Sequence, residues 1–359
     1  MTDQDRPEEP RLTVLDSLNG AQDAGSLKQS FVDGSAEIAI GAAVASGFGV
    51  ESAKTLIAGD TAGRWWFLLV CLAGIGLIVF GFWRREQLRR RVHIGIVATA
   101  ADAAKGLAHA RQLESQAETY SRAWPVTVKT GVQLPAGGGT APELVQALAD
   151  KTIEAITLAE QLSPNAVQIN LFPTMRLHVA FRYGARLGQT HTRGVMVYEP
   201  HHDDGAPSHF PAALLKATET VGGPLNIDGL ENIDGGDPTS TALALDLQAR
   251  GEAFFAPVRK TCQEDGIGNL LRLSSRVSRL PENTETFTAA VDQICRTWFE
   301  TQLPDGARTG RHAVFLSGPV AIAVALGARL ATADHGRWTA YTYDAANNTC
   351  VPFPPTAST

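Results

Sequence analysis

The sequence predicts an α/β fold of two similar halves packed as a pseudo-dimer, preceded by an N-terminal transmembrane helical segment. Three observations predict it: strand-length apolar runs alternate with amphipathic helices from Val92 onward, one helix–loop–strand pattern occurs twice, and an uncharged run precedes both. Alternating strands and helices favour a largely parallel sheet with helices on both faces, in which ligands bind at the carboxyl ends of the strands.

The uncharged run extends over 19 residues, from Trp65 to Trp83. At about 1.5 Å per residue it nearly spans a hydrocarbon core of about 30 Å, so it predicts a transmembrane helix. Tryptophans at both ends suit the headgroup regions, and arginines from Arg84 to Arg91 mark the cytoplasmic side. We therefore expect everything after Arg91 to be cytosolic; the alternative is a buried core helix of a soluble domain.

A second, weaker membrane helix is predicted over residues 36–58, after a polar tail at 1–34. Glu51 and Lys54 are three residues apart and could pair on one face of this helix. Charges at that depth face a bundle interior or a water-filled path, which makes them possible pore-lining residues. The alternative is that the helix ends near Val50 and both charges lie in a solvated connection. The membrane segment as a whole covers residues 35–91.

Composition limits the classes of function. The chain has 359 residues, 44% apolar and 19% charged, and a net charge of -6, which argues against a general nucleic-acid-binding surface and against direct DNA binding. Its four cysteines lack metal-ligand spacing and fit a reducing compartment better than a disulfide scaffold. We expect no metal and no cofactor.

The first half is read from periodicity. Apolar runs of strand length and amphipathic stretches predict strands at Val92–Ala100, Val126–Leu134 and Ala166–Phe172 and helices at Asp102–Tyr120 and Glu143–Leu162. The glycine-rich tract Gly222–Ser240 reads as a long loop.

An internal repeat defines the second half. The tetrapeptide Gly-Ala-Arg-Leu occurs at Gly184–Leu187 and at Gly327–Leu330, about 143 residues apart. Each copy lies in an apolar helix whose first turn is expected at a proline, Pro173 or Pro319, and precedes a strand that carries a tyrosine, Tyr198 or Tyr341. Matched flanking elements predict two similar halves, at about 92–200 and 250–355, within one domain at 92–359.

The stretches LFPTMRLHVAFRYGARL…GVMVYE and FLSGPVAIAVALGARL…WTAYTYD…CVPFP resemble the two halves of a SAVED domain. This is a fused pair of Rossmann-like CARF-type units found in bacterial antiviral systems, and the resemblance covers approximately Val92 to Pro355. With membrane helices attached, the chain resembles the membrane-spanning SAVED effectors of cyclic-oligonucleotide-based antiphage signalling systems (CBASS). The resemblance implies a cyclic-oligonucleotide sensor in the bacterial inner membrane. It further implies self-association on ligand binding, permeabilisation of the bilayer and abortive infection.

A cyclic oligonucleotide needs helix N-termini, a few basic side chains and flat apolar surfaces in its pocket. The strand ends supply most of the candidates, and for any one of them an ordinary strand-to-helix turn is the alternative. The predicted ligand-binding residues are Thr99, Ala100, Asp102, Phe172, Pro173, Thr174, Arg176, Arg259, Lys260, Ser317, Gly318 and Pro319. Arg176 is the first choice among the basic residues, whereas solvated charge is the alternative for Arg259 and Lys260.

Signs of catalysis are few. No GxSxG, HExxH or phosphate-binding loop motif occurs, and the run from His201 to Asp204 lacks a spaced metal-binding partner. We therefore expect no enzyme activity. The alternative is a membrane-anchored α/β enzyme acting on nucleotides, such as a phosphodiesterase or ring nuclease.

Overall fold

The structure is a computed structural model, and it describes the ranges 11–14, 72–83, 93–102, 107–121, 126–134, 142–162, 168–188, 194–201, 208–216, 222–332 and 336–353, with residue 191. These residues fall into two compact units. The larger contains β1 (Arg11–Val14) and the α/β part from His93 onward; the smaller contains the helix at 72–83.

The first sheet has six strands in the order β1-β3-β2-β4-β5-β6. The four central strands run parallel, and β1 and β6 are antiparallel edges. Besides β1, its strands are β2 (His93–Asp102), β3 (Val126–Leu134), β4 (Gln168–Thr174), β5 (Gly194–Pro200) and β6 (His209–Leu214).

The second sheet repeats this order as β7-β9-β8-β10-β11-β12, again with antiparallel strands at both edges. Its strands are β7 (Leu225–Asn232), β8 (Asp237–Asp246), β9 (Ile267–Ser275), β10 (His312–Ser317), β11 (Trp338–Asp344) and β12 (Thr349–Pro352). The two halves therefore share one topology, as the internal repeat predicts.

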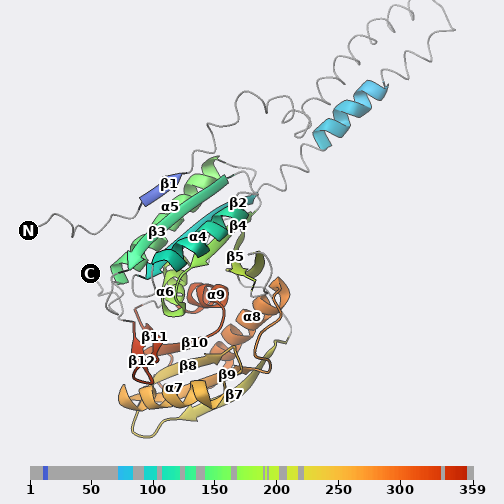
Figure 1. Cartoon of the computed structure of the whole chain (residues 1–359). Coiled ribbons are helices and arrows are strands. Elements are labelled where there is room, and N and C mark those ends of the chain that lie inside the picture. The colour runs from blue at the N-terminus through green and yellow to red at the C-terminus, as the bar shows by residue number, and fades with distance from the viewer. Residues whose placement is uncertain are drawn as a thin grey trace, which may run out of the picture. The chain divides into compact units, whose positions relative to one another are not determined.

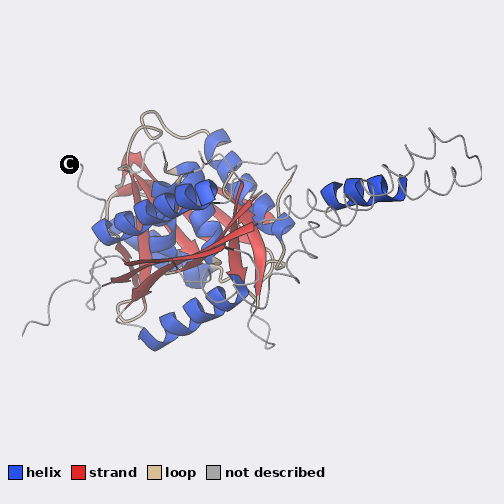
Figure 2. Cartoon of the chain, turned by 90° about the horizontal axis from the view of Figure 1, so that it is seen from above, coloured by secondary structure: helices blue, strands red, loops and turns tan. Residues whose placement is uncertain are grey.

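Helices lie on more than one side of the strands (Figure 2). In the first half these are α4 (Leu107–Ser121), α5 (Pro142–Leu162) and α6 (Leu177–Leu187), and in the second α7 (Glu252–Glu264), α8 (Thr284–Glu300) and α9 (Val320–Leu330). Lys129 of β3 pairs with Glu118 of α4, and its neighbour Thr130 bonds to Thr152 of α5. Since successive strand residues point to opposite faces, α4 and α5 lie on opposite sides of the sheet.

Helices α6 and α9 lie against each other between the two sheets (Figure 1). Gly184 and Gly327 form the point of closest approach, because a Cβ at either position would overlap the backbone of the other helix. The repeated arginines lie two residues further on, and each pairs with an aspartate of the preceding helix: Arg186 with Asp150, and Arg329 with Asp292. The Gly-Ala-Arg-Leu repeat is thus a helix-packing element.

The smaller unit contributes a helix at 72–83 with several large apolar side chains exposed, among them Leu72, Val79 and Phe82. Trp83 at its end is 54% exposed. Within the described ranges no helix is both long and apolar enough to cross a membrane. The predicted helix at 36–58, the start of the predicted helix at 65–83, and Glu51, Lys54 and Trp65 lie outside the described residues.

Two sequence-based interpretations are wrong. The tract Gly222–Ser240 is not a loop: it contains β7 and the start of β8, which belong to the second sheet. Its glycines serve a β-bulge near Gly229 and a turn at Gly235, both at positive φ (97° and 77°). Pro173 does not begin a helix but lies within β4; the first helical residue is Leu177.

Candidate functional site

A cleft of about 460 Å³ opens at the carboxyl ends of the strands in the second sheet. It is the position where ligands bind in open α/β sheets, and its volume is in the range of small-molecule sites. Four segments meet there: the start of α6, the turn after β8, the β10–α9 junction and the end of β11. Its lining residues are Met175, Arg176, Leu177, His178, Gln248, Arg250, Leu316, Ser317, Gly318, Val320, Tyr341, Thr342 and Tyr343.

The N-terminus of α6 is part of the cleft wall. Arg176 is the N-cap residue (φ -72°, ψ 155°) and makes no side-chain capping bond. A helix N-terminus carries a partial positive charge, so Arg176 adds a full charge where the helix already favours an anion. His178, in the first turn of α6, is buried beside Phe353, with ring centroids 5.4 Å apart, and so packs in the core of the domain.

The turn after β8 brings Gln248 and Arg250 to the cleft. Buried Asp246 holds this turn, because its two carboxylate oxygens accept the N–H groups of Gln248 and Gly251 at 3.2 and 2.7 Å. Among the described residues Arg250 has no ion-pair partner, and it is exposed. Among the described residues that line the cleft there is no aspartate or glutamate, and the charged ones are arginines.

An adjoining cavity of about 260 Å³ shares Arg250 and Tyr341 with the cleft and adds aromatic surface. Tyr341 stacks on Phe315 at 4.4 Å between centroids, and its hydroxyl donates to Asp265 at 2.7 Å. Burial and this carboxylate raise the pKa of Tyr341, so the ring stays neutral. Tyr343, half of which is exposed, donates its hydroxyl to Asn348 at 2.9 Å. Both phenol rings are held in place by hydrogen bonds at their outer ends.

Gly318, at the β10–α9 junction, lines both the cleft and a third, smaller cavity. Its φ of 156° and the neighbouring Leu247 leave no room for a side chain, since an added Cβ would be 2.7 Å from the Leu247 Cβ. Ser317 next to it donates to Gln248 at 3.0 Å and joins β10 to the turn after β8.

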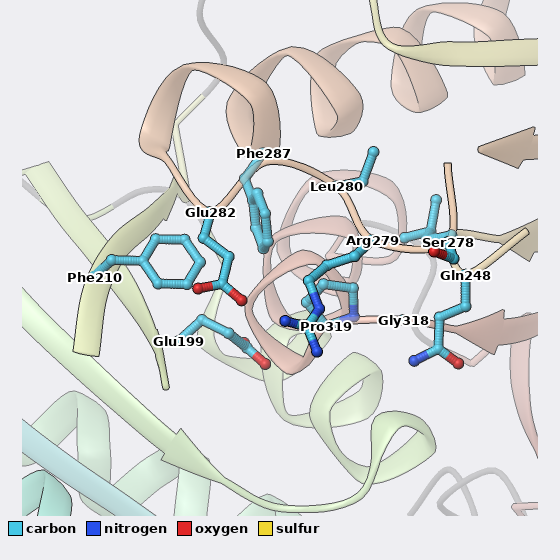
Figure 3. Close-up of a pocket in the computed structure, with 11 residues that line it drawn as sticks. Glu199, Phe210, Gln248, Ser278, Arg279, Leu280, Glu282, Phe287, Gly318 and Pro319 are labelled. Atoms are coloured by element: carbon cyan, nitrogen blue, oxygen red, sulfur yellow. The ribbon is translucent and has the colours of Figure 1, made fainter. Parts of the chain in front are cut away.

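This third cavity has a volume of about 160 Å³ and is lined by Gly318 and Pro319 of the junction together with Glu199, Arg279 and Glu282 (Figure 3). The carboxylates of Glu199 and Glu282 and the guanidinium of Arg279 point into it (Figure 3). Glu199 accepts the N–H groups of Val320 and Ala321 at 3.1 and 2.7 Å, so it caps α9 from a strand of the other half. Burial raises the pKa of Glu199 to about 7 although the two N–H bonds lower it, and Glu282 raises it further.

The cleft brings together three of the predicted residues, Arg176, Ser317 and Gly318, while Pro319 lines the smaller cavity. Five candidates from the strand ends of the first half line none of the three cavities: Thr99 and Ala100 near the end of β2, and Phe172, Pro173 and Thr174 at the end of β4. Asp102 is the last residue of β2, and its side chain lies outside the described part of the chain. Phe172 instead packs on Tyr198 at 4.7 Å, under α4.

Arg259 and Lys260 lie on α7 and line none of the three cavities. Arg259 bonds to Glu231 of β7 at 2.9 Å and to Glu252 at 2.7 Å, and these carboxylates raise its pKa. Lys260 is 3.8 Å from Glu264. Both basic side chains of α7 thus lie near carboxylates of the second half. Two adjacent basic residues in the sequence do not by themselves indicate these ion pairs.

Of the run from His201 to Asp204, only His201 is described, and its Nδ1 lies 2.6 Å from Glu282. Over the described ranges no group of three or more His, Cys, Asp or Glu side chains is placed to hold a metal ion. Sequence reasoning missed Arg250, Tyr343 and Glu199. Arg250 carried a usable signal, because it follows a buried strand and an aspartate in the second half.

No protein-family model matches the sequence, and no curated protein matches it. Solved structures of similar arrangement include the Acinetobacter baumannii Cap4 SAVED/CARF-domain containing receptor with the cyclic trinucleotides 3'3'3'-cAAA and 2'3'3'-cAAA. Their sequence identities are 14% and 13% and their TM-scores 0.45 and 0.42; each match covers 80% of this chain and 58% of the receptor. The corresponding receptor of Moraxella osloensis shows 13% identity over 88% of this chain and 75% of its own, with a TM-score of 0.35. The chain thus spans less than two thirds of the length of the Acinetobacter receptor.

Proposed function

We propose that this chain is a cyclic-oligonucleotide sensor of a CBASS antiphage system that acts on the bacterial inner membrane. The observation that carries the proposal is the cleft at the start of α6, which combines a helix N-terminus with Arg176 and Arg250 and has no carboxylate among its described lining residues. Phosphate groups bind to this combination, because helix N–H groups and guanidinium groups both donate hydrogen bonds to anionic oxygens. The sequence resemblance to SAVED domains supports the same ligand class.

The base-binding part of the site is the adjoining cavity. Phe254, Tyr341 and Tyr343 present flat surfaces there, and Arg250 lies between this cavity and the cleft. A nucleotide with its phosphate at α6 can therefore direct its base toward aromatic rings, on which bases of any identity stack. The two adjoining volumes allow contact with more than one nucleotide of a ring.

The effector part is the N-terminal apolar segment. The exposed side chains of the helix at 72–83 include Leu72, Ile75 and Phe80, a surface that lipid or a second copy of the helix would cover. Ligand binding favours self-association of the cytoplasmic domain, which gathers these helices and permeabilises the membrane, with abortive infection as the result. The ligand must bind the assembled state more tightly than the monomer, since equal affinity would shift no population.

Equilibrium binding by the full-length chain in detergent tests the sensor function. The probes are 3'3'3'-cAAA, 2'3'3'-cAAA and cyclic dinucleotides and tetranucleotides, with linear triadenylate as the control. Binding of one ring with faster sedimentation of the chain is the expected result. Binding of no ring contradicts the proposal, and conversion of a ring to linear product would indicate the nucleotide-directed enzyme instead.

Release of a dye trapped in liposomes tests the effector function. Reconstituted chain should release the dye only when the ring that binds is added. Ligand-independent release, or tight binding without release, would contradict the membrane step while leaving the sensor intact.

A further inference from the structure

The two halves differ at the position that faces each central helix N-terminus. Arg176 and Pro319 are the N-caps of α6 and α9, with similar backbone angles, and are 143 residues apart. At the same separation, Glu199 of β5 and Thr342 of β11 follow the repeated tyrosines. Glu199 contacts α9, whereas Thr342 lines the cleft at the start of α6. A glutamate therefore faces one helix N-terminus and a threonine faces the other.

Glu199 occupies the place that a ligand anion would take at α9. Its two carboxylate oxygens each accept one N–H group of the first turn, from Val320 and Ala321, and its side chain is 4% exposed. A carboxylate in this position satisfies the donors and the partial positive charge that otherwise attract an external anion. An incoming phosphate would have to displace a buried group and then expose it elsewhere.

The charges around the two helix N-termini reinforce this difference. The smaller cavity at α9 holds two carboxylates, Glu199 and Glu282, against one guanidinium of Arg279. The part of the α6 cleft that the structure describes holds Arg176 and Arg250 and no carboxylate. Its volume of about 460 Å³ also exceeds the 160 Å³ beside α9. Among the described residues, a carboxylate therefore caps the N-terminus of α9, and none lines the cleft at the N-terminus of α6.

We propose that Glu199 is a specificity-determining residue, an internal carboxylate that closes the α9 N-terminus so that the pseudo-symmetric domain accepts ligand phosphate only at α6. Thr342 leaves the equivalent place at α6 open. This inference rests on the proposed function and deepens it: the ring is bound asymmetrically, with one phosphate at a helix N-terminus and the rest held by side chains.

The test is best performed near pH 8, where Glu199 is ionised. The pKa of Glu199 is about 7, and the titratable groups around it are Glu282, His201, Arg279 and, on β6, His209, whose pKa is lowered to about 4 by burial. At pH 8 His209 is therefore neutral, and Glu199, which accepts the two N–H groups of α9, carries its charge.

Exchange of Glu199 and Thr342 between the two halves tests the proposal. The probe is inorganic pyrophosphate, and the measurement is the NMR shift of backbone amide signals in the isotope-labelled full-length chain. In the wild type, pyrophosphate should shift the signals of Leu177 and Val179 and leave those of Val320 and Ala321 unchanged. Glu199→Thr should make the α9 signals respond as well. Thr342→Glu should weaken the response at α6 at least tenfold. The double exchange should move the response from α6 to α9.

Glu199→Gln is the second variant in case the threonine variant does not fold, because the amide keeps one acceptor for the α9 N–H groups while losing the charge. It should bind pyrophosphate at α9 more tightly than the wild type. The proposal fails if pyrophosphate moves the α9 signals of the wild type, or if neither Glu199 variant responds there. This measurement involves no cyclic oligonucleotide, so its result does not depend on whether the sensor proposal holds.

Discussion

Gly184 of α6 and Gly327 of α9 make reciprocal contacts. A Cβ on Gly184 would lie 2.0 Å from the carbonyl oxygen of Val324, and a Cβ on Gly327 would lie 1.9 Å from that of Phe181. Phe181 and Val324 each precede the glycine of their own helix by three residues, so each helix offers the same two positions to the other. A self-complementary contact of this kind is the signature of a local twofold axis.

The glycine contact predicts that either Gly184→Ala or Gly327→Ala destabilises the fold. A methyl group would have to enter the space of a backbone carbonyl, and because neither helix backbone can yield locally, the helices must separate. Overpacking of this kind costs about 1–3 kcal/mol or more in free energy of unfolding. Chemical denaturation of each variant measures it. Gly194→Ala is the matched control, since a Cβ there meets nothing within 4 Å, and an equal loss in the control would contradict the prediction.

The two repeated arginines predict unequal effects of one substitution. Arg329 and Asp292 form a buried pair, with side chains 8% and 3% exposed, whereas Arg186 and Asp150 form an exposed one. Arg329→Leu should cost about 3–5 kcal/mol because it leaves a buried carboxylate uncompensated. Arg186→Leu should cost less than about 1 kcal/mol. Denaturation curves of the two variants, measured side by side, decide this, and equal costs would refute it.

Periodicity predicts most of the first half well. The strand Val126–Leu134 has the predicted bounds, and α5 begins one residue before its predicted start. Long amphipathic patterns are reliable because burial of one face decides their structure. The strands β7 and β8 are missed because glycine dominates the tract, and its role in a bulge depends on the partner strand β9.

The candidate site is predicted in part. The repeat locates the starts of α6 and α9, but it takes Pro173 as the counterpart of Pro319. The residue that corresponds to Pro319 in the structure is Arg176, three residues later, because these two are the N-caps of the helices. Arg259 is chosen for its charge, whereas its ion pairs with Glu231 and Glu252 depend on how α7 packs. Glu199 is missed because its partners are 121 and 122 residues away in the sequence.

Glu199 predicts a pH dependence of stability. Its pKa is about 7 in the folded chain, against an ordinary value of 4.5. Between pH 4.5 and pH 7 the folded chain therefore keeps a proton on Glu199 that the unfolded chain has already released. Stability should therefore fall as pH rises from about 4.5 to 7 and then level off. Glu199→Gln removes this dependence, and its stability relative to the wild type should increase by about 3 kcal/mol from pH 4.5 to pH 8. Denaturation at both pH values measures the difference; parallel changes in the two proteins would contradict it.

The cleft arginines predict which basic side chains hold the ligand. Arg176→Ala and Arg250→Ala should each weaken binding of the cyclic oligonucleotide about tenfold or more, because each removes a charge-assisted contact of about 1.5–3 kcal/mol. The remaining affinity should depend less on salt, since fewer charges are left to screen.

Arg259→Ala is the matched control for these two variants, because Arg259 is equally basic but is bound to Glu231 and Glu252 and lines neither cavity. Its affinity for the ring should equal that of the wild type, and only its stability should change. Titration of all three variants at two salt concentrations separates the possibilities. If Arg259→Ala weakens binding as much as Arg250→Ala does, the ligand lies along α7, and the cleft at α6 is not the nucleotide site.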